Sequence, residues 1–93
     1  MHKKEHAEQN ERALAIAKAS LAQNGYTKDL EEKFLDRSDF EKWDMAQEKV
    51  NQIKNTAYDA IKSEFPDMTD RRIKSAIAKA LRHLRNQWRN QNV

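Results

Sequence analysis

Only one glycine and one proline interrupt the 93 residues of this chain, and their scarcity limits the folds that it can adopt. Sandwiches, barrels and repeated strand–helix–strand units need many tight turns, which these two residues mainly supply. The segment before the glycine, residues 3–24, is rich in alanine, glutamate, glutamine, lysine and leucine, which favour helices. The sequence therefore predicts an all-α fold, a small helical bundle of three longer helices plus one short helix, forming a single domain over residues 1–93.

Residues that stop helices divide the chain, and the predicted helices span about 3–24, 28–36, 39–65 and 70–90. Gly25 supplies the left-handed residue that ends many helices, and it places Leu21 and Tyr26 at the two contact positions of a Schellman ending. Pro66 ends the third helix because the residue before a proline disfavours helical backbone angles.

Hydroxyl side chains precede the last three predicted helices. Thr27 and Thr69 are each placed to act as an N-cap, accepting a hydrogen bond from a free amide of the first turn. Ser38, with Glu41 three residues later, matches a capping box, so Ser38 is the predicted N-cap of the third helix.

Apolar residues at helical spacing define the expected core. On the first helix they are Ala7, Leu14, Ala17 and Leu21; on the third, Trp43, Ala46, Val50, Ile53, Ala57, Ile61 and Phe65; on the fourth, Ile73, Ile77, Ala80, Leu81, Leu84 and Trp88. Trp43 and Ile53 lie centrally on the longest stripe, so truncating either should cost about 2–5 kcal/mol. Phe40 and Tyr58 fall off that stripe and are candidates for an exposed contact patch.

Charge is distributed unevenly along the chain, although the net charge is only +3. Residues 1–24 carry a net +1, and residues 25–70, with seven basic and twelve acidic side chains, carry −5. Residues 71–93 carry +7 and no acid; their basic residues are Arg71, Arg72, Lys74, Lys79, Arg82, Arg85 and Arg89. Such an asymmetry is typical of a chain with an acidic partner.

These seven basic residues share one side of the fourth helix. With about 100° per residue, the apolar residues lie within about 80° of Ile73 and the basic ones between about 100° and 260°. Five of the seven are arginines, which bind carboxylates and phosphates in a bidentate manner. We therefore expect a non-enzymatic regulatory protein, of the inhibitor or adaptor kind common in bacteria and phages, that binds an acidic partner protein through this face.

Other interpretations of the same face stay open. Nucleic-acid binding, non-specific or architectural, would use the basic side chains on phosphates. Self-association would pair the basic segment of one copy with the acidic segment of another. A solvated face is the plainest interpretation, but such a face normally mixes both signs. The acidic residues Asp29, Glu31, Glu32 and Asp36 form a candidate secondary docking patch, although helix-start preference explains most of them.

The residue inventory argues against an enzyme, a metal site and a bound cofactor. The chain has no cysteine and no glycine-rich loop, and its serines lack a histidine within hydrogen-bond reach. His2 to His6 match the zinc-peptidase pattern H-x-x-E-H, but a third ligand is missing. The longest apolar run is five residues, so neither a membrane span nor a signal peptide is expected, and the predicted location is the cytoplasm.

Overall fold

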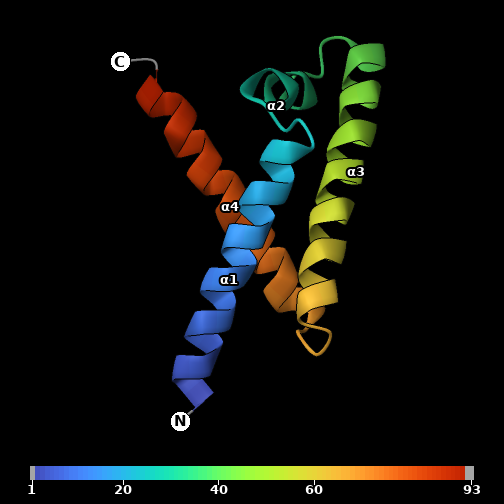
Figure 1. The fold of residues 1–93 in the computed structure, drawn as a ribbon. Helices are drawn as coiled ribbons and strands as arrows, with labels where there is room; N and C mark the ends of the chain where they lie inside the picture. The colour runs from blue at the N-terminus through green and yellow to red at the C-terminus, as the bar shows by residue number, and fades with distance from the viewer. Residues whose placement is uncertain (1, 92–93) are drawn as a thin grey trace.

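The computed structural model describes the backbone of residues 2–91 and the side chains of residues 6–91. It contains the helices α1 (His2–Gln23), α2 (Lys28–Leu35), α3 (Phe40–Glu64) and α4 (Asp70–Gln91) (Figure 1). No strand occurs in the described part of the chain, and the predicted all-α class with three longer helices and one short helix is confirmed. Each observed boundary differs from the predicted one by no more than one residue.

The four helices are loosely arranged, and α1 contacts both of the other long helices. Helix α1 packs against both α3 and α4, and α2 packs against α3. Helices α3 and α4 are antiparallel, and their axes diverge from the short connection that joins them (Figure 1). Helix α1 crosses α4. The molecule measures 50 × 31 × 19 Å, and its shortest dimension matches two layers of helices of about 10 Å each. The bundle is therefore open, with α3 and α4 held together largely through α1.

The core lies where α1 crosses the other two long helices. Its largest fully buried side chains are Leu21, Val50, Ile61 and Ile73, one or more from each of the three long helices. Alanine residues surround them on all three helices and allow the backbones to approach closely. The predicted stripes of α3 and α4 supply most of the buried residues, so helical periodicity located the core correctly.

The buried face of α1 differs from the predicted one. Ala17 and Leu21 are fully buried as expected, but Ala7 is exposed and Leu14 is only half-buried. Ala13 is fully buried instead. The reason is that α1 packs against two diverging helices at once, so its contact face is rotated from the one that the larger side chains define.

Trp43 was expected at the centre of the core, and this prediction is wrong. Its side chain is half-buried and lies outside the main cluster, whereas Ile53 is 4% exposed within it. Trp43 packs on Phe40, with ring centroids 5.7 Å apart, and the guanidinium of Arg37 lies 5.5 Å from its ring. The first turns of α3 extend beyond the end of α1 (Figure 1), so no long helix covers them.

The turn after α1 is a Schellman motif, as predicted. The amide of Tyr26 donates to the carbonyl of Leu21 at 2.9 Å, and the amide of Gly25 donates to the carbonyl of Ala22 at 3.3 Å. Gly25 has φ = 85°, in the left-handed region, and both Leu21 and Tyr26 are buried. The motif thus ends α1 and places Tyr26 in the core.

Replacing Gly25 with alanine should lower the free energy of unfolding by about 1–2 kcal/mol, because a Cβ is strained at this φ. The added carbon would meet no atom within 4 Å, so the cost comes from the backbone alone. Gly25→Asn is the control, since asparagine tolerates left-handed angles better, and its loss should be smaller. Thermal unfolding followed by circular dichroism measures both; an alanine variant as stable as the wild type would contradict this expectation.

The two threonine caps are confirmed. The amide of Leu30 donates to Thr27 Oγ1 at 3.2 Å at the start of α2, and the amide of Arg72 donates to Thr69 Oγ1 at 3.3 Å at the start of α4. Each bond satisfies an amide that has no partner within its own helix.

The predicted capping box at Ser38 is wrong. Asp39 is the N-cap of α3, and its carboxylate accepts from the amide of Lys42 at 3.3 Å. Ser38 instead donates through its hydroxyl, at 2.6 Å, and through its amide, at 2.9 Å, to Asp36 Oδ1. These hydrogen bonds lower the pKa of Asp36 below its usual value. Because the hydroxyl of Ser38 is bonded to Asp36, Asp39 acts as the N-cap of α3 in place of Ser38.

Candidate functional site

Helix α4 carries the candidate site, and its two sides differ completely. Six residues of one side are buried: Ile73, Ala76, Ile77, Ala80, Leu81 and Leu84. Of the seven basic residues predicted to form the binding face, Arg72 is half-buried and the other six are exposed. Their partners within the chain divide the seven into different groups.

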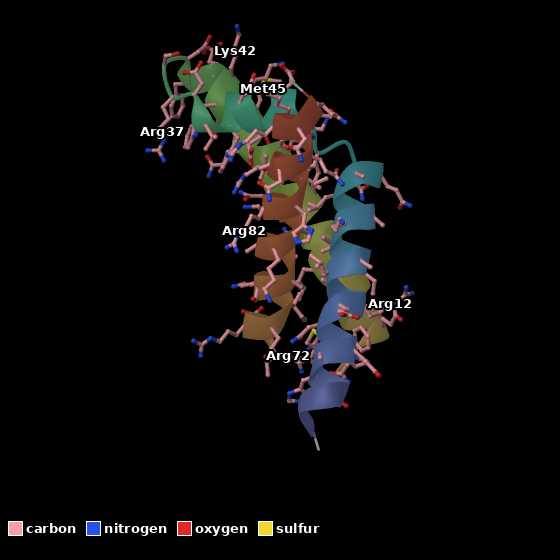
Figure 2. The ribbon with its side chains drawn as sticks, turned by 90° about the vertical axis from the view of Figure 1, so that its left-hand side faces the viewer. Arg12, Arg37, Lys42, Met45, Arg72 and Arg82 are labelled. Atoms are coloured by element: carbon pink, nitrogen blue, oxygen red, sulfur yellow. The ribbon has the colours of Figure 1, made fainter. Side chains whose placement is uncertain are left out.

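Arg72 is used inside the protein. Its Nη2 donates to Gln9 Oε1 at 3.2 Å and to Asn10 Oδ1 at 3.0 Å, both on α1. Figure 2 shows this side chain between α4 and α1, whereas Arg82 points away from α1. Arg72 therefore links α4 to α1, and we do not count it in the exposed basic surface.

Arg85 is also used inside the protein, in a cluster with Glu31 and Tyr26. Glu31, only 7% exposed, accepts hydrogen bonds on its Oε1 from Arg85 Nε at 2.8 Å and from the Tyr26 hydroxyl at 2.9 Å, and Arg85 Nη2 forms a salt bridge with the same oxygen at 2.6 Å. The Tyr26 ring in turn stacks on Trp88, with centroids 6.1 Å apart. The cluster ties α2 and the turn after α1 to the second half of α4.

The surroundings of this cluster change two pKa values. Burial, reinforced by the hydrogen bond to Glu31, raises the pKa of Tyr26 well above its usual value. The hydrogen bond to Glu31 also raises the pKa of Arg85, more than its partial burial lowers it. Tyr26 thus stays a neutral donor and Arg85 a cation, which are the forms that a buried carboxylate requires.

Four of the predicted basic residues remain as an exposed row, which we call the basic ridge: Arg71, Lys79, Arg82 and Arg89. None of them forms a salt bridge with any residue between 6 and 91. At about 100° per residue they lie about 160–240° from Ile73, opposite the core. From Arg71 to Arg89 the row is about 27 Å long at about 1.5 Å per residue.

Lys74 lies beside the basic ridge but is paired with Asp70. The distance from Nζ to Oδ2 is 3.1 Å, and both side chains are mostly exposed. Lys74 and Tyr58 hold the pKa of Asp70 below its usual value, Tyr58 having the larger effect. An exposed pair one turn apart contributes little stability, so Lys74 can exchange Asp70 for an external carboxylate at low cost.

Of the four residues of the predicted acidic docking patch, Asp29, Glu32 and Asp36 are exposed and Glu31 is buried. Glu31 is buried against Arg85, Asp29 pairs with Lys33 at 3.1 Å, and Asp36 holds Ser38. Glu32 and Asp36 are both exposed without a salt bridge to the described side chains, and of these two only Glu32 also lacks a side-chain hydrogen bond to them. These carboxylates therefore serve mainly to build the structure around α2.

A groove between α3 and α4 is the main feature that sequence reasoning missed. It has a volume of about 460 Å³, and its lining residues are Asn51, Lys54, Asn55, Tyr58, Lys74, Ile77, Ala78 and Leu81. We call this feature the α3–α4 groove. Of the two aromatic residues predicted to be exposed, Tyr58 lines this groove, while Phe40 is 69% exposed at the far end of α3. The signal available in the sequence was the run of uncharged residues Asn51, Asn55 and Tyr58 beside the apolar stripe.

The described residues lack two further kinds of feature. Within the described residues, no three His, Asp or Glu side chains lie close enough together to hold a metal ion, and most of the H-x-x-E-H motif falls outside the described side chains. None of the helices in the described part of the chain combines the length and apolar character needed to cross a bilayer. No protein-family model, curated protein or solved structure matches the chain.

Proposed function

We propose that the chain is a non-enzymatic binding protein that holds an acidic surface of a partner protein on the basic ridge of α4. The observation that carries this proposal is the row of four exposed cations, none of them in a salt bridge with the residues between 6 and 91. A partner can bind these cations without first breaking an ion pair among the described side chains. Most of the other basic residues of α4 are used by the fold itself.

The chemistry of the basic ridge suits a carboxylate-bearing partner. Three of its four members, Arg71, Arg82 and Arg89, are arginines, which form paired hydrogen bonds with carboxylates. Arginine is enriched in protein interfaces, whereas lysine is depleted. A row of like charges also accelerates association with an oppositely charged surface.

The α3–α4 groove favours a protein over nucleic acid as the partner. Apolar and uncharged side chains of the groove lie beside the basic ridge, and Ala78 belongs to the groove while adjoining Arg82 by helical position. A phosphate backbone needs cations but gains nothing from a neighbouring apolar groove. Trp88 stacks on Tyr26 and is therefore not free to stack on bases.

Affinity capture with a charge-reversed variant tests the proposal. Wild-type protein immobilised on resin is exposed to a lysate of the source organism, and the main captured protein is purified and titrated. The triple variant R71E/R82E/R89E should bind that protein at least about tenfold more weakly, which corresponds to a loss of about 1.4 kcal/mol in binding free energy. Circular dichroism should show an unchanged helix content, because all three side chains are exposed.

The matched control is K33E/K42E/K49E, which reverses the same number of exposed charges on α2 and α3, beside a hollow that α4 does not line, and should keep the partner. Equal losses in both triple variants would mean that only net charge matters and would contradict a specific ridge. Nuclease treatment of the lysate supplies the other comparison. If nuclease abolishes the capture, and the protein gives a salt-sensitive gel shift with duplex DNA, then the partner is nucleic acid and not a protein.

A further inference from the structure

A small hollow between α1 and α4 contains two cations and no carboxylate among its lining residues, which are Asn10, Arg72, Ser75, Ala76 and Lys79. We call this hollow the α1–α4 notch. The four residues from α4 lie within about 100° of one another around that helix. The notch has a volume of about 80 Å³, which is the space of about three water molecules in the liquid. It can therefore hold one small charged group, and the rest of a ligand must lie outside.

Arg72 supplies a guanidinium that the fold holds in place without neutralising it. Its two hydrogen bonds to α1 go to the side-chain oxygens of Gln9 and Asn10, at 3.2 and 3.0 Å, and both of these partners are uncharged amides. Both bonds use Nη2, so the N–H groups of Nε and Nη1 can still donate to a ligand. Figure 2 shows this side chain between α4 and α1. The notch thus contains a cation that is already positioned.

The other polar residues of the notch add a second cation and two neutral donors. Lys79 is exposed and forms no salt bridge with any residue between 6 and 91. Ser75 contributes a hydroxyl, and Asn10 contributes its amide nitrogen, because its oxygen is bonded to Arg72. An anion in the notch would therefore meet two positive charges and two uncharged donors.

The described carboxylates nearest to the notch in the sequence do not cancel this charge. Glu8 and Glu11 lie about 160° and 100° from Asn10 around α1, and neither of them lines the notch. Neither forms a salt bridge with an α4 cation. Asp70 is paired with Lys74 on another side of α4. The two cations of the notch therefore have no acidic partner among the described side chains.

We infer that the α1–α4 notch binds a phosphoryl group in the form of a monoester or free phosphate, and this inference does not depend on the partner protein proposed above. A phosphate monoester carries a charge of about −1.5 to −2 near neutral pH and has three acceptor oxygens. Arg72 and Lys79 balance that charge, and the guanidinium, hydroxyl and amide donors suit its several oxygens.

The alternative anions fit the notch less well than a phosphate monoester. A carboxylate has a single charge and two oxygens, so it would leave one of the two cations unbalanced. Each diester phosphate of a nucleic acid also has a single charge. The charge of the notch therefore favours the monoester over both.

The test uses a short peptide with blocked termini whose only charged side chain is phosphoserine, at a pH well above its second pKa of about 6. Two control peptides have aspartate or serine at the same position. Titration of isotope-labelled protein, followed by amide NMR shifts, should give the largest changes at Asn10, Ser75 and Lys79. The aspartate peptide should bind at least about tenfold more weakly, and the serine peptide should not bind. Equal affinities for phosphoserine and aspartate, or equal shifts along the whole basic ridge, would overturn the inference.

Four variants of exposed residues locate the binding on the protein. Lys79→Gln removes a cation from the notch, and Arg82→Gln removes one from the basic ridge outside it. Ser75→Asp places a carboxylate in the notch, and Asn86→Asp adds the same charge about 16 Å further along α4. Each notch variant should weaken binding of the phosphoserine peptide at least about tenfold, and each control by less than about threefold. Unfolding midpoints show that all four are folded. Notch variants that bind as tightly as their controls would contradict the inference.

Inorganic phosphate and dimethyl phosphate identify the source of the group. Tighter binding of the phosphoserine peptide than of inorganic phosphate assigns the notch to a phosphorylated protein chain. The reverse order assigns it to the free ion, and both results support a phosphoryl site. Dimethyl phosphate is a diester, and if it binds as tightly as the peptide, a nucleic-acid backbone replaces the monoester and the inference is wrong. The triple variant R71E/R82E/R89E tests the basic ridge separately, since none of its three residues lines the notch.

Discussion

Replacing Ile53 with alanine should lower the free energy of unfolding by about 2–5 kcal/mol, and replacing the larger Trp43 should lower it by less than about 2 kcal/mol. Ile53 is 4% exposed in the cluster where α1 and α3 pack, so its removal leaves a cavity that the surrounding helices cannot close. Trp43 is half-buried at the outer end of α3, where water can replace much of the lost contact.

Urea unfolding followed by far-ultraviolet circular dichroism measures both changes. A domain of this length has a total stability of about 5–14 kcal/mol, so the Ile53 variant loses a large fraction of it. If the Ile53 variant is too unstable to fold, Ile53→Val supplies a smaller cut of about 0.5–1.5 kcal/mol at the same position. A larger loss for Trp43→Ala than for Ile53→Ala would mean that the core extends to the end of α3.

Replacing Arg85 with alanine should lower the free energy of unfolding by about 2–3 kcal/mol, more than any change on the basic ridge. Glu31 is 7% exposed, and Arg85 supplies one of the two hydrogen bonds to its Oε1 together with a salt bridge from Nη2. Without Arg85 the carboxylate keeps only the Tyr26 hydroxyl as a donor. The cost is below that of a fully buried pair because the Arg85 side chain is itself 49% exposed, which lets water reach the site.

Arg82→Ala is the matched control, since it removes the same side chain three residues earlier on the same helix. Arg82 is exposed and forms no salt bridge with the described residues, so its loss should change stability by less than about 0.5 kcal/mol. The double variant E31A/R85A should be more stable than the sum of the single changes predicts, because it leaves no unpaired buried carboxylate. Equal losses for Arg85→Ala and Arg82→Ala would show that the cluster does not hold α4.

The fold could be predicted largely because its signals are local. Gly25, Thr27 and Thr69 each act through atoms within a few residues, and all three behave as the sequence indicated. The failures occur where a competing partner decides the outcome. Ser38 is captured by Asp36, and Trp43 is left half-buried because the divergence of the long helices cannot be read from periodicity.

The candidate site could be predicted only in part. Helical periodicity placed all seven basic residues on the side of α4 opposite the core, and none of them is buried. Periodicity could not show that Glu31 and Arg85, which are 54 residues apart in the chain, would meet and neutralise each other. The groove was missed for the same reason, because its walls come from two helices whose separation depends on a third.

That third helix gives the molecule a mechanical property. Helices α3 and α4 share a short connection at one end and diverge from it, and α1 sets how far apart they stay (Figure 1). The spacing of the groove walls therefore depends on how α1 is packed. A ligand that binds only when the walls have the observed spacing makes α1 harder to detach. A change that loosens α1 lowers the binding free energy of that ligand by the same amount.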